Sequence, residues 1–534
     1  MSDNFPSSQS ATIQRKVVIA ACFGTFLEWY DFLTFASLAT YFSTLFFPQE
    51  NPVAALLASL ATFGVGMLVR PLGAALFGSL GDKYGRRPVF IATIALMGVA
   101  TFCVGLLPTY AQVGMLAPAL LLVLRLLQGF SVGGEIGGAA VYLTEHAPIN
   151  KRGAYTSVLQ LMGPLGILVS TLQIVLLQSL LSVDDFQAWG WRVPFLLSIV
   201  LLLISLKSRV NMYESPVFLH LREKHALSKA PLRECISNPH TLGRMALLFF
   251  CISAGGSLLF FSSQVYANVY LKSVVRLDPQ IASTLVMLST LVLFPLTIYF
   301  GWLSDRVGRR PLLLAGLLLG SLTIFPVFKG LMHYGNPTLE RFNREVPVAL
   351  YGESCAYDPF TSTRNDCERN QQLLAKLGVS YTLYPAQKPR DILVPNDTLV
   401  HIGKSEVIGH QPAELTQLLK AEGWTEQADP LQTDRLRIFL LLLIPVVAVA
   451  LITGPQTATL AELFPARTRY TAVALPHNLS AGWIGGLSPF MITLLSVKTG
   501  NALSGMWYPV GLLTMAFVIG LIFMPETRNA SLED

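Results

Sequence analysis

Residues 78–88 read GSLGDKYGRRP, and the same pattern returns at 301–311 as GWLSDRVGRRP. Each copy places a glycine, an aspartate and two arginines at matching positions in a short polar turn that follows an apolar segment. Glycine permits a tight turn with positive φ, and an aspartate at a helix end can accept hydrogen bonds from a helix N-terminus or from an opposing arginine. Basic residues that only orient a membrane protein would not require this repeated spacing. We therefore predict that both turns form a gate on the cytoplasmic side of a membrane protein. The residues assigned to this cytoplasmic gate are Asp82, Arg86, Asp305, Arg309, Glu145 and Arg152.

Two further pairs of segments show that the repeat extends along the chain. TEHAPINKRG at 144–153 matches AELFPARTRY at 461–470, and ESPVF at 214–218 matches ETRNA at 526–530. The distance along the sequence between the two copies is larger in these pairs than in the first pair. The increase is close to the length of one long polar segment in the second half. The chain therefore consists of two similar halves in parallel, with an insertion in the second, which is an architecture of transporters.

The composition places both halves in a lipid bilayer. Of the 534 residues, 52% are hydrophobic and only 13% are charged, whereas soluble proteins carry roughly a quarter charged residues. A bilayer core of about 30 Å requires roughly 20 apolar helical residues to cross it. Twelve stretches meet this requirement, so we predict an all-α polytopic membrane protein with twelve transmembrane helices in two six-helix bundles. The stretches lie near 17–45, 55–80, 89–108, 112–142, 154–181, 192–209, 243–271, 281–302, 311–332, 437–463, 471–497 and 504–524.

The basic residues indicate which side each loop faces. Loops after even-numbered spans contain Lys or Arg, whereas the short loops near 48–54, 109–111 and 182–191 contain neither. Because cytoplasmic loops are enriched in Lys and Arg, we expect both termini in the cytoplasm and a multi-pass protein of the cell inner membrane. The N-terminus lacks a cleavage pattern, so the first span is expected to direct insertion. The formal net charge of +6 comes from these loops and does not indicate a nucleic-acid partner.

The segment 333–436 is too long for an ordinary connection. EVPVALYG, VSYTLY and DILVP alternate as short strands do, and PAELTQLLKAEGW at 412–424 is typical of an amphipathic helix. We predict a small α+β extracytoplasmic insert between helices nine and ten. Cys355 and Cys367 lie in this segment, on the side where disulfides persist, so we expect them to be bonded; two unpaired thiols are the alternative. The expected divisions are an N-terminal bundle at 1–209, a cytoplasmic linker at 210–242, helices seven to nine at 243–332, the insert at 333–436 and helices ten to twelve at 437–534.

Four charged side chains fall near the middle of the predicted spans of the first half, and Glu135 lies ten residues nearer the cytoplasm than Arg125 in span four. Glu28 and Asp31 share a face of span one, while Arg70 lies in span two and Arg125 in span four. An ionised side chain at this depth is costly unless it is paired or hydrated, and it usually marks a substrate or proton pathway. We expect a switch in which deprotonated Asp31 pairs with Arg125 and protonation releases the arginine. Glu28 is the second candidate proton carrier, and a buried ion pair that only fixes helix packing is the alternative.

Arg70 is the candidate contact for a substrate anion, because a guanidinium can hold a carboxylate in a bidentate manner. If Glu28 is neutral and Asp31 pairs with Arg125, Arg70 remains free for an organic acid; pairing with Glu28 is the alternative. The second half offers polar residues in spans seven and eleven, for which helix packing is the alternative role. The predicted substrate-binding residues are Arg70, Arg125, Gln264, Tyr266, Asn268 and His477.

Four stretches carry a resemblance to a known family. These are GTFLEWYDF at 24–32, RPLGAALFGSLGDKYGRRP at 70–88, RLLQGFSVGGE at 125–135 and PETRN at 525–529. The repeated turn resembles the signature loop of the major facilitator superfamily, and the four stretches resemble its metabolite:proton symporter family. This resemblance implies carboxylates such as citrate, 2-oxoglutarate and shikimate, or proline and betaine, as substrates. The related sugar porters are similar in placing an aspartate like Asp31 in span one and an arginine like Arg125 at the start of an R-x-x-x-G run in span four.

The motifs of common enzyme classes do not occur in the sequence. It contains no P-loop, zinc-ligand spacing, G-x-S-x-G or dinucleotide fingerprint, so we expect no enzyme activity, no cofactor and no metal. The predicted function is proton-coupled symport of a small organic acid or related metabolite by alternating access. The expected partners are the small-molecule substrate, protons and the bilayer, with the protein acting as a monomer. The alternatives are a proline/betaine symporter and a solute sensor that uses the insert.

Overall fold

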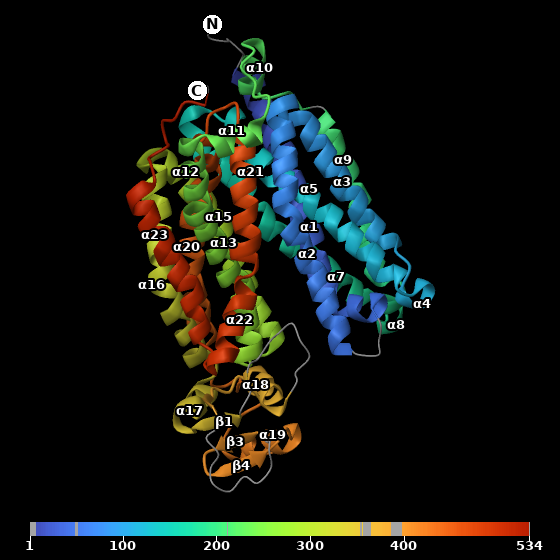
Figure 1. Ribbon diagram of the computed structural model, residues 1–534, viewed down its shortest axis with the longest axis vertical. Coiled ribbons are helices and arrows are strands. Elements are labelled where there is room, and N and C mark those ends of the chain that lie inside the picture. The colour runs from blue at the N-terminus through green and yellow to red at the C-terminus, as the bar shows by residue number, and fades with distance from the viewer. Residues whose placement is uncertain are drawn as a thin grey trace.

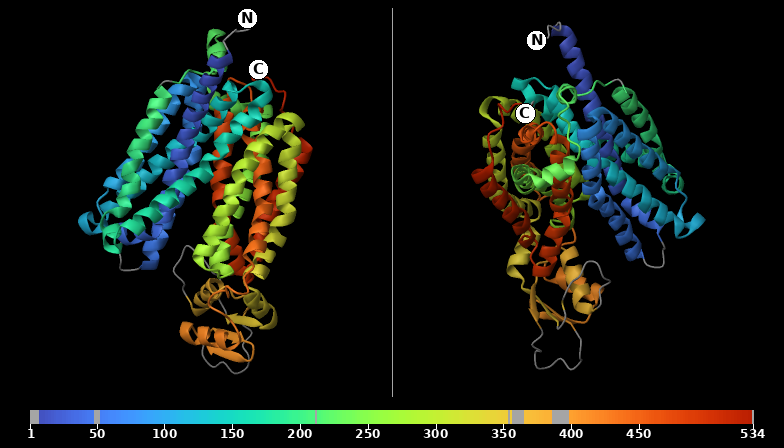
Figure 2. Two further views of the ribbon diagram at one scale, coloured as in Figure 1. Left: turned by 180° about the vertical axis from the view of Figure 1, so that it is seen from behind. Right: turned by 45° about the horizontal axis from the view of Figure 1, so that its top comes forward.

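The computed structural model describes residues 7–47, 52–210, 212–352, 355, 365–385 and 398–532. Two helical bundles lie side by side (Figures 1 and 2). They are in contact near the chain termini and spread apart toward the opposite end, where a small mixed domain extends the second bundle. Among the described residues, eleven helical segments are long and apolar enough to cross a membrane. The prediction of a mostly helical, polytopic protein is therefore confirmed.

The first bundle is built around α1, a 40-residue helix that packs against α2, α5, α7 and α9. The turn between α2 and α3 holds Gly85 at φ 115°, a backbone conformation that favours glycine. The helices of this bundle are α1 (Ser7–Phe46), α2 (Pro52–Tyr84), α3 (Arg86–Leu106), α4 (Tyr110–Val113), α5 (Leu116–His146), η1 (Ile149–Lys151), α6 (Arg152–Gln160), α7 (Met162–Leu180), α8 (Val183–Ala188), η2 (Gly190–Arg192) and α9 (Val193–Val210). Two short helices, α10 (Pro216–Glu223) and α11 (Pro231–Ser237), follow on the side of the termini.

The second bundle repeats this plan, and Gly308, at φ 111°, forms the turn that corresponds to Gly85. Its first span is continuous from Pro239 to Val274 but alternates between α-helix and π-helical turns. The helices are α12 (Pro239–Leu247), η3 (Leu248–Ser253), α13 (Ala254–Phe260), η4 (Phe261–Tyr266), α14 (Ala267–Val269), η5 (Tyr270–Val274), α15 (Pro279–Val307), α16 (Arg309–Gly335), α20 (Arg435–Glu462), α21 (Arg469–Ser480), η6 (Ala481–Gly486), α22 (Ser488–Thr499), η7 (Ser504–Met506) and α23 (Trp507–Phe523).

The insert lies between α16 and α20 and is an α+β domain. Its four strands are ordered β2-β1-β3-β4, with β1 parallel to β2 and antiparallel to β3. Its elements are α17 (Pro337–Glu345), β1 (Val348–Gly352), α18 (Asp366–Lys376), β2 (Thr382–Pro385), β3 (Leu399–Ile402), β4 (Ser405–Ile408) and α19 (Pro412–Ala421). A disulfide joins Cys355 to Cys367.

The predictions for the insert hold in part. The strands expected in EVPVALYG and VSYTLY and the helix expected at 412–424 are present as β1, β2 and α19, whereas DILVP lies outside the described residues. The strands β3 and β4 and the helices α17 and α18 were not predicted. Each strand has only four residues, which is too short for an alternating pattern to stand out.

Hydrogen bonds fasten the insert to the second bundle. Asn336 donates to the carbonyl of Val275 at 3.0 Å, and Arg276 donates to two insert carbonyls, those of Glu426 at 2.9 Å and Lys376 at 3.2 Å. The N–H of Tyr381 donates to the carbonyl of Gly500 at 2.8 Å, and its hydroxyl donates to that of Val497. The insert thus contacts the ends of two different spans, and the loop after α18 contacts one of them.

Candidate functional site

A pocket in the first bundle brings together the charged residues of spans one, two and four. Arg125 Nη1 lies 3.2 Å from Asp31 Oδ2, and the Gln128 amide donates to Asp31 Oδ1 at 3.0 Å. The guanidinium of Arg125 also lies 3.6 Å from the centroid of the Phe35 ring. The pocket is lined by Glu28, Asp31, Phe32, Gly66, Arg70, Arg125, Gln128, Gly129 and Val132. The structure therefore pairs Asp31 with Arg125 and places the pair at a cavity.

Close packing of α2 on α5 positions the two arginines. A side chain at Gly133 would meet the backbone of Ala74 at 2.6 Å, and one at Gly129 would meet the Gly66 backbone at 2.7 Å. Small residues allow helices to approach this closely inside a membrane. The glycines of RLLQGFSVGGE thus bring Arg70 and Arg125, on neighbouring helices, to one pocket.

Glu28 and Arg70 form the second charged pair of the pocket. Arg70 Nη1 lies 3.4 Å from Glu28 Oε1, which is the alternative partner that we considered for Arg70. This contact is looser than the one at Asp31, because neither carboxylate oxygen of Glu28 has a hydrogen-bond partner among the described residues. Arg70 Nε and Arg125 Nε and Nη2 also have no hydrogen-bond partner among the described residues. Buried polar atoms without partners are uncommon in folded proteins, so this pocket retains unused capacity for protons and for an anion.

The polar residues predicted in the second half do not line this pocket. His477 Nδ1 lies 2.8 Å from Ser253 Oγ, and its ring is close enough to Arg70 for their charges to interact. Gln264 accepts a hydrogen bond from Thr290, an intra-bundle contact of the kind that packs helices. Asn268 Oδ1 has no partner within the described part of the chain. Of this group, His477 is the residue that the structure places near the charged pocket.

Tyr266 packs in the second bundle rather than at the pocket. Its ring lies 6.2 Å from that of Tyr270 and 5.8 Å from that of Phe328, and the side chain is buried. Asn478, which follows His477 on α21, does reach the other half: its amide donates to the carbonyl of Gly133 at 2.9 Å. Asn478 was not among the predicted site residues.

The first copy of the repeated turn, around Asp82, joins the two bundles near the chain termini. The Asp82 carboxylate accepts from the backbone N–H groups of Tyr470 and Thr471 at 3.1 and 2.8 Å, at the start of α21. Free N–H groups at a helix N-terminus form a site that favours negative charge. Glu145, on α5, lies 2.9 Å from Arg469 of the other bundle and 3.4 Å from Arg86.

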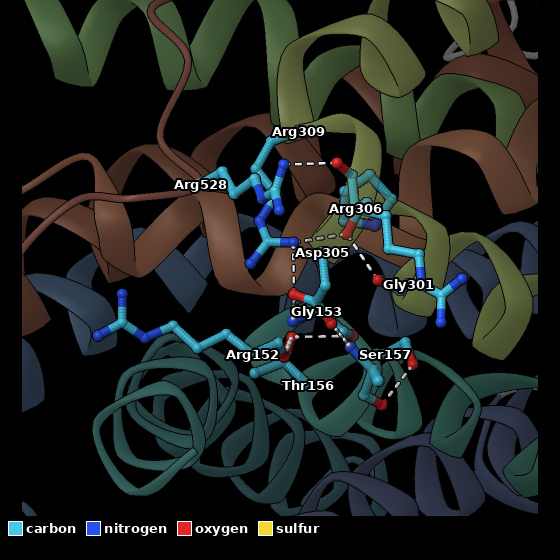
Figure 3. A network of polar contacts seen from close by, with 12 residues as sticks. Arg152, Gly153, Thr156, Ser157, Gly301, Asp305, Arg306, Arg309 and Arg528 are labelled. Atoms are coloured by element: carbon cyan, nitrogen blue, oxygen red, sulfur yellow. Dashed lines mark hydrogen bonds and ion pairs between the residues drawn. The ribbon is translucent and has the colours of Figure 1, made fainter. Parts of the chain in front are cut away.

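The second copy forms the matching contact in the opposite direction (Figure 3). Asp305, on α15, accepts from the N–H groups of Gly153 and Ala154 at 2.8 and 2.9 Å, at the start of α6. Arg309 Nη1 lies 2.7 Å from Asp305, in the same network as Gly153 and Arg152 (Figure 3). Glu462 lies 3.2 Å from Arg309 and 3.7 Å from Arg152, so the charge cluster again crosses between the bundles.

All six predicted gate residues therefore lie in these two clusters, but four important members were not assigned to the gate. Arg469 and Glu462 are the counterparts of Arg152 and Glu145. Glu214 accepts from the N–H groups of Arg86 and Arg87, and Glu526 does the same for Arg309 and Arg310. The repeat 144–153/461–470 aligns Glu462 with Glu145 and Arg469 with Arg152, so it contained the signal for these two. The repeat 214–218/526–530 aligns Glu214 with Glu526, and neither of these two had been assigned a role.

Comparisons with known proteins identify the relatives of this chain. Residues 17–247 match the family model described as sugar (and other) transporter. The chain is 38% identical over 322 residues to the shikimate transporter of Escherichia coli K12, covering 59% of this chain and 72% of that protein. The chain belongs to the major facilitator superfamily, within its metabolite:proton symporters. A relative from Dickeya dadantii, a glycine betaine/proline/ectoine/pipecolic acid transporter, is 29% identical over 97% of this chain and 85% of its own length.

The fold of the superfamily is also seen in solved structures. The proton:xylose symporter XylE from E. coli superimposes with a TM-score of 0.61 over 98% of each chain, at 16% identity. At this identity the likeness concerns the fold alone. The chain is thus a membrane transporter of the metabolite:proton symporter family rather than an enzyme, and proteins of this family transport small molecules.

Proposed function

We propose that the protein imports a small organic anion together with a proton by alternating access. The observation that carries this proposal is the charge balance of the pocket. With Glu28 and Asp31 ionised, their charges cancel those of Arg70 and Arg125. Protonation of one carboxylate leaves a net positive charge in a medium where unbalanced charge is costly, and a substrate carboxylate would restore the balance. Proton and anion would then bind together.

The same pocket supplies the contacts for both. The unpartnered N–H groups of Arg70 and Arg125 are suited to a carboxylate. Glu28 is suited to take the proton because no hydrogen bond from the described residues stabilises its ionised form. Asp31 would act as the switch. When Asp31 is protonated in its turn, it releases Arg125 to the substrate. Gln264, Tyr266, Asn268 and His477 would complete the substrate path from the second half, with His477 nearest to Arg70.

The two clusters at Asp82 and Asp305 would act as the cytoplasmic gate. Both are formed, and the bundles spread apart at the other end (Figure 1). We propose that this arrangement is the outward-facing state. Rocking of the bundles would separate the carboxylates from the N-termini of α21 and α6 and open the inner side.

We propose that α1 and the eleven other spans make twelve, that both termini are cytoplasmic and that the protein acts as a monomer in the inner membrane. The insert would then lie outside, between helices nine and ten, with the domain limits given above. Because its described hydrogen bonds run to the second bundle, the insert would move with that half.

Uptake into proteoliposomes tests the function. Purified protein is given shikimate, citrate, 2-oxoglutarate, proline or betaine, with and without an inward proton gradient. Accumulation of an acid that stops on adding an uncoupler supports the proposal, and the Asp31→Asn variant should then lose accumulation. Full accumulation by Asp31→Asn contradicts the switch.

Two other outcomes have a specific meaning. Accumulation of proline or betaine alone favours a compatible-solute symporter, the role named for the Dickeya relative. A zwitterion could use one arginine and one carboxylate of the pocket. Absence of uptake of all five compounds, with binding of one of them, favours a solute sensor that uses the insert.

A further inference from the structure

A further buried ion pair lies deeper in the first bundle, on the cytoplasmic side of the pocket. Glu135, on α5, forms hydrogen bonds with Arg209 through both oxygens and accepts from the Thr93 hydroxyl at 3.0 Å. Arg209 also donates to the carbonyl of Phe90 at 2.9 Å. Both charged side chains are almost fully buried, at 2% and 1% exposure. Neither belongs to the gate clusters or lines the pocket.

This pair lies against the same face of α1 as the pocket. A side chain at Gly24 would collide with the Glu135 carboxylate and with Arg209, whose Cζ would be 2.7 Å away. Gly24 precedes Glu28 by four residues, and Asp31 follows Glu28 by three, so all three positions face one side of the helix. One helical turn spans about 5.4 Å. Three carboxylates, from Asp31, Glu28 and Glu135, therefore follow one another down this face.

One side chain between Glu28 and Glu135, that of Thr25, is suited to carry a proton. The Glu135 carboxylate lies against Gly24, about one helical turn before Glu28 on α1. The buried Thr25 hydroxyl lies on the adjoining part of the same face and has no hydrogen-bond partner in the described ranges. A hydroxyl can accept one proton and donate another.

We propose that Glu135 is the proton acceptor that follows Glu28 on the way to the cytoplasm. In the state described here the Thr25 hydroxyl bonds neither carboxylate, so the transfer requires Thr25 and Glu28 to rotate into hydrogen-bond reach of each other and of Glu135. The O–H bond of protonated Glu28 then breaks as the proton passes to the Thr25 oxygen, and the Thr25 proton moves on to a Glu135 oxygen. Glu28 is left ionised, and Glu135 neutral, until water from the cytoplasm takes the proton. This inference rests on the proton coupling proposed above.

The surroundings of Glu135 fit such an exchange. The groups facing it are Arg209 from α9, Thr93 from α3, Glu28 from α1 and Tyr470 from α21, whose hydroxyl donates to Gly134 at 2.6 Å. The positive charge of Arg209 favours the ionised form of Glu135, so Glu135 returns to that form once water has taken the proton. Its position in the last turn of α9 places the pair near the cytoplasmic end of that span.

Substrate exchange separates a relay from a structural ion pair, because exchange keeps the carrier protonated and requires no proton release. Wild type and Glu135→Gln are reconstituted and supplied with radiolabelled shikimate, or with the acid that wild type accumulates in the uptake panel. Glu135→Gln should retain counterflow and lose proton-driven accumulation by about 10²-fold, the usual contribution of a positioned proton carrier. Wild-type accumulation by Glu135→Gln overturns the relay.

The double variant Glu135→Gln/Arg209→Gln covers the case in which the single variant misfolds by leaving Arg209 unpaired. It removes both charges, so a merely structural pair predicts recovery of counterflow and accumulation together, which would overturn the proposal. The relay predicts counterflow without accumulation. If wild type itself shows no proton-driven uptake of any acid, the proposed symport fails, and this outcome is distinct from failure of Glu135 alone.

Discussion

The carboxylate of Asp82 lies 2.8 Å from both the backbone nitrogen and the hydroxyl oxygen of Thr471, although the two residues belong to different halves of the chain. Asp305 makes the corresponding contact with the first turn of α6. Each half therefore offers one carboxylate and one helix N-terminus to the other. This reciprocity makes the contact between the bundles near the chain termini depend on two equivalent and separable contacts.

We expect Asp82→Asn to open the cytoplasmic side. The amide retains one acceptor oxygen but presents its NH2 group to backbone donors, and a hydrogen bond to a charged group contributes about 1.5–3 kcal/mol. Spin-label distances across the inner side should shift toward the open state. Lys83→Gln, at an exposed position of the same turn, is the control. Unchanged distances in Asp82→Asn would exclude this contact as a latch.

Cys235 should report the same opening through its reactivity. Burial raises the pKa of its thiol to about 12, and Sγ lies 3.9 Å from the carbonyl of Thr468, just before α21. Since the thiolate is the reactive form, labelling by N-ethylmaleimide near neutral pH should be slow in wild type and faster in Asp82→Asn. The measurement uses a background in which Cys22, Cys103 and Cys251 are replaced by serine. Equal rates in the two proteins would contradict the prediction.

Arg70→Gln should weaken substrate binding more than it slows turnover. Loss of a charged hydrogen bond of about 1.5–3 kcal/mol corresponds to a rise in KM of roughly 10- to 100-fold for an anion. Arg192→Gln is the matched control, because Arg192 donates to the carbonyls of Gly105 and Leu107 at 2.8 and 2.7 Å, away from the pocket. The control should lower thermal stability and leave KM unchanged. A similar KM for Arg70→Gln and wild type would remove Arg70 from the binding site.

Tyr381→Phe should loosen the insert without changing the transport site. It removes the hydroxyl bond to Val497, which contributes about 1 kcal/mol and corresponds to a fall in Tm of roughly 2–4 °C in a large domain. Thermal unfolding of the purified protein measures this change. Tyr384→Phe, at an exposed position of β2, serves as the control. An equal Tm for both variants would show that the hydroxyl bond of Tyr381 does not help to fasten the insert.

The spans could be predicted because each one is recognised from its own residues alone. A segment crosses the bilayer when enough consecutive residues are apolar, and α15 or α16 can be recognised from its own residues. The repeated turn was equally readable, because Gly85 and Gly308 serve a backbone conformation that few other residues adopt. In the insert, β3 and β4 escaped prediction because their pairing partners, not their own four residues, stabilise them.

The sequence by itself determined the membrane class, the two-fold repeat, the transport family and the four charges of the pocket. Only the tertiary structure decided how those charges pair: Arg70 with Glu28, Asp82 with the start of α21, and Glu135 with Arg209. In each case the sequence offered a charge with several eligible partners. Which partner is reached depends on how close the helices pack, as α2 does on α5, and that distance is set by side chains far apart in the chain.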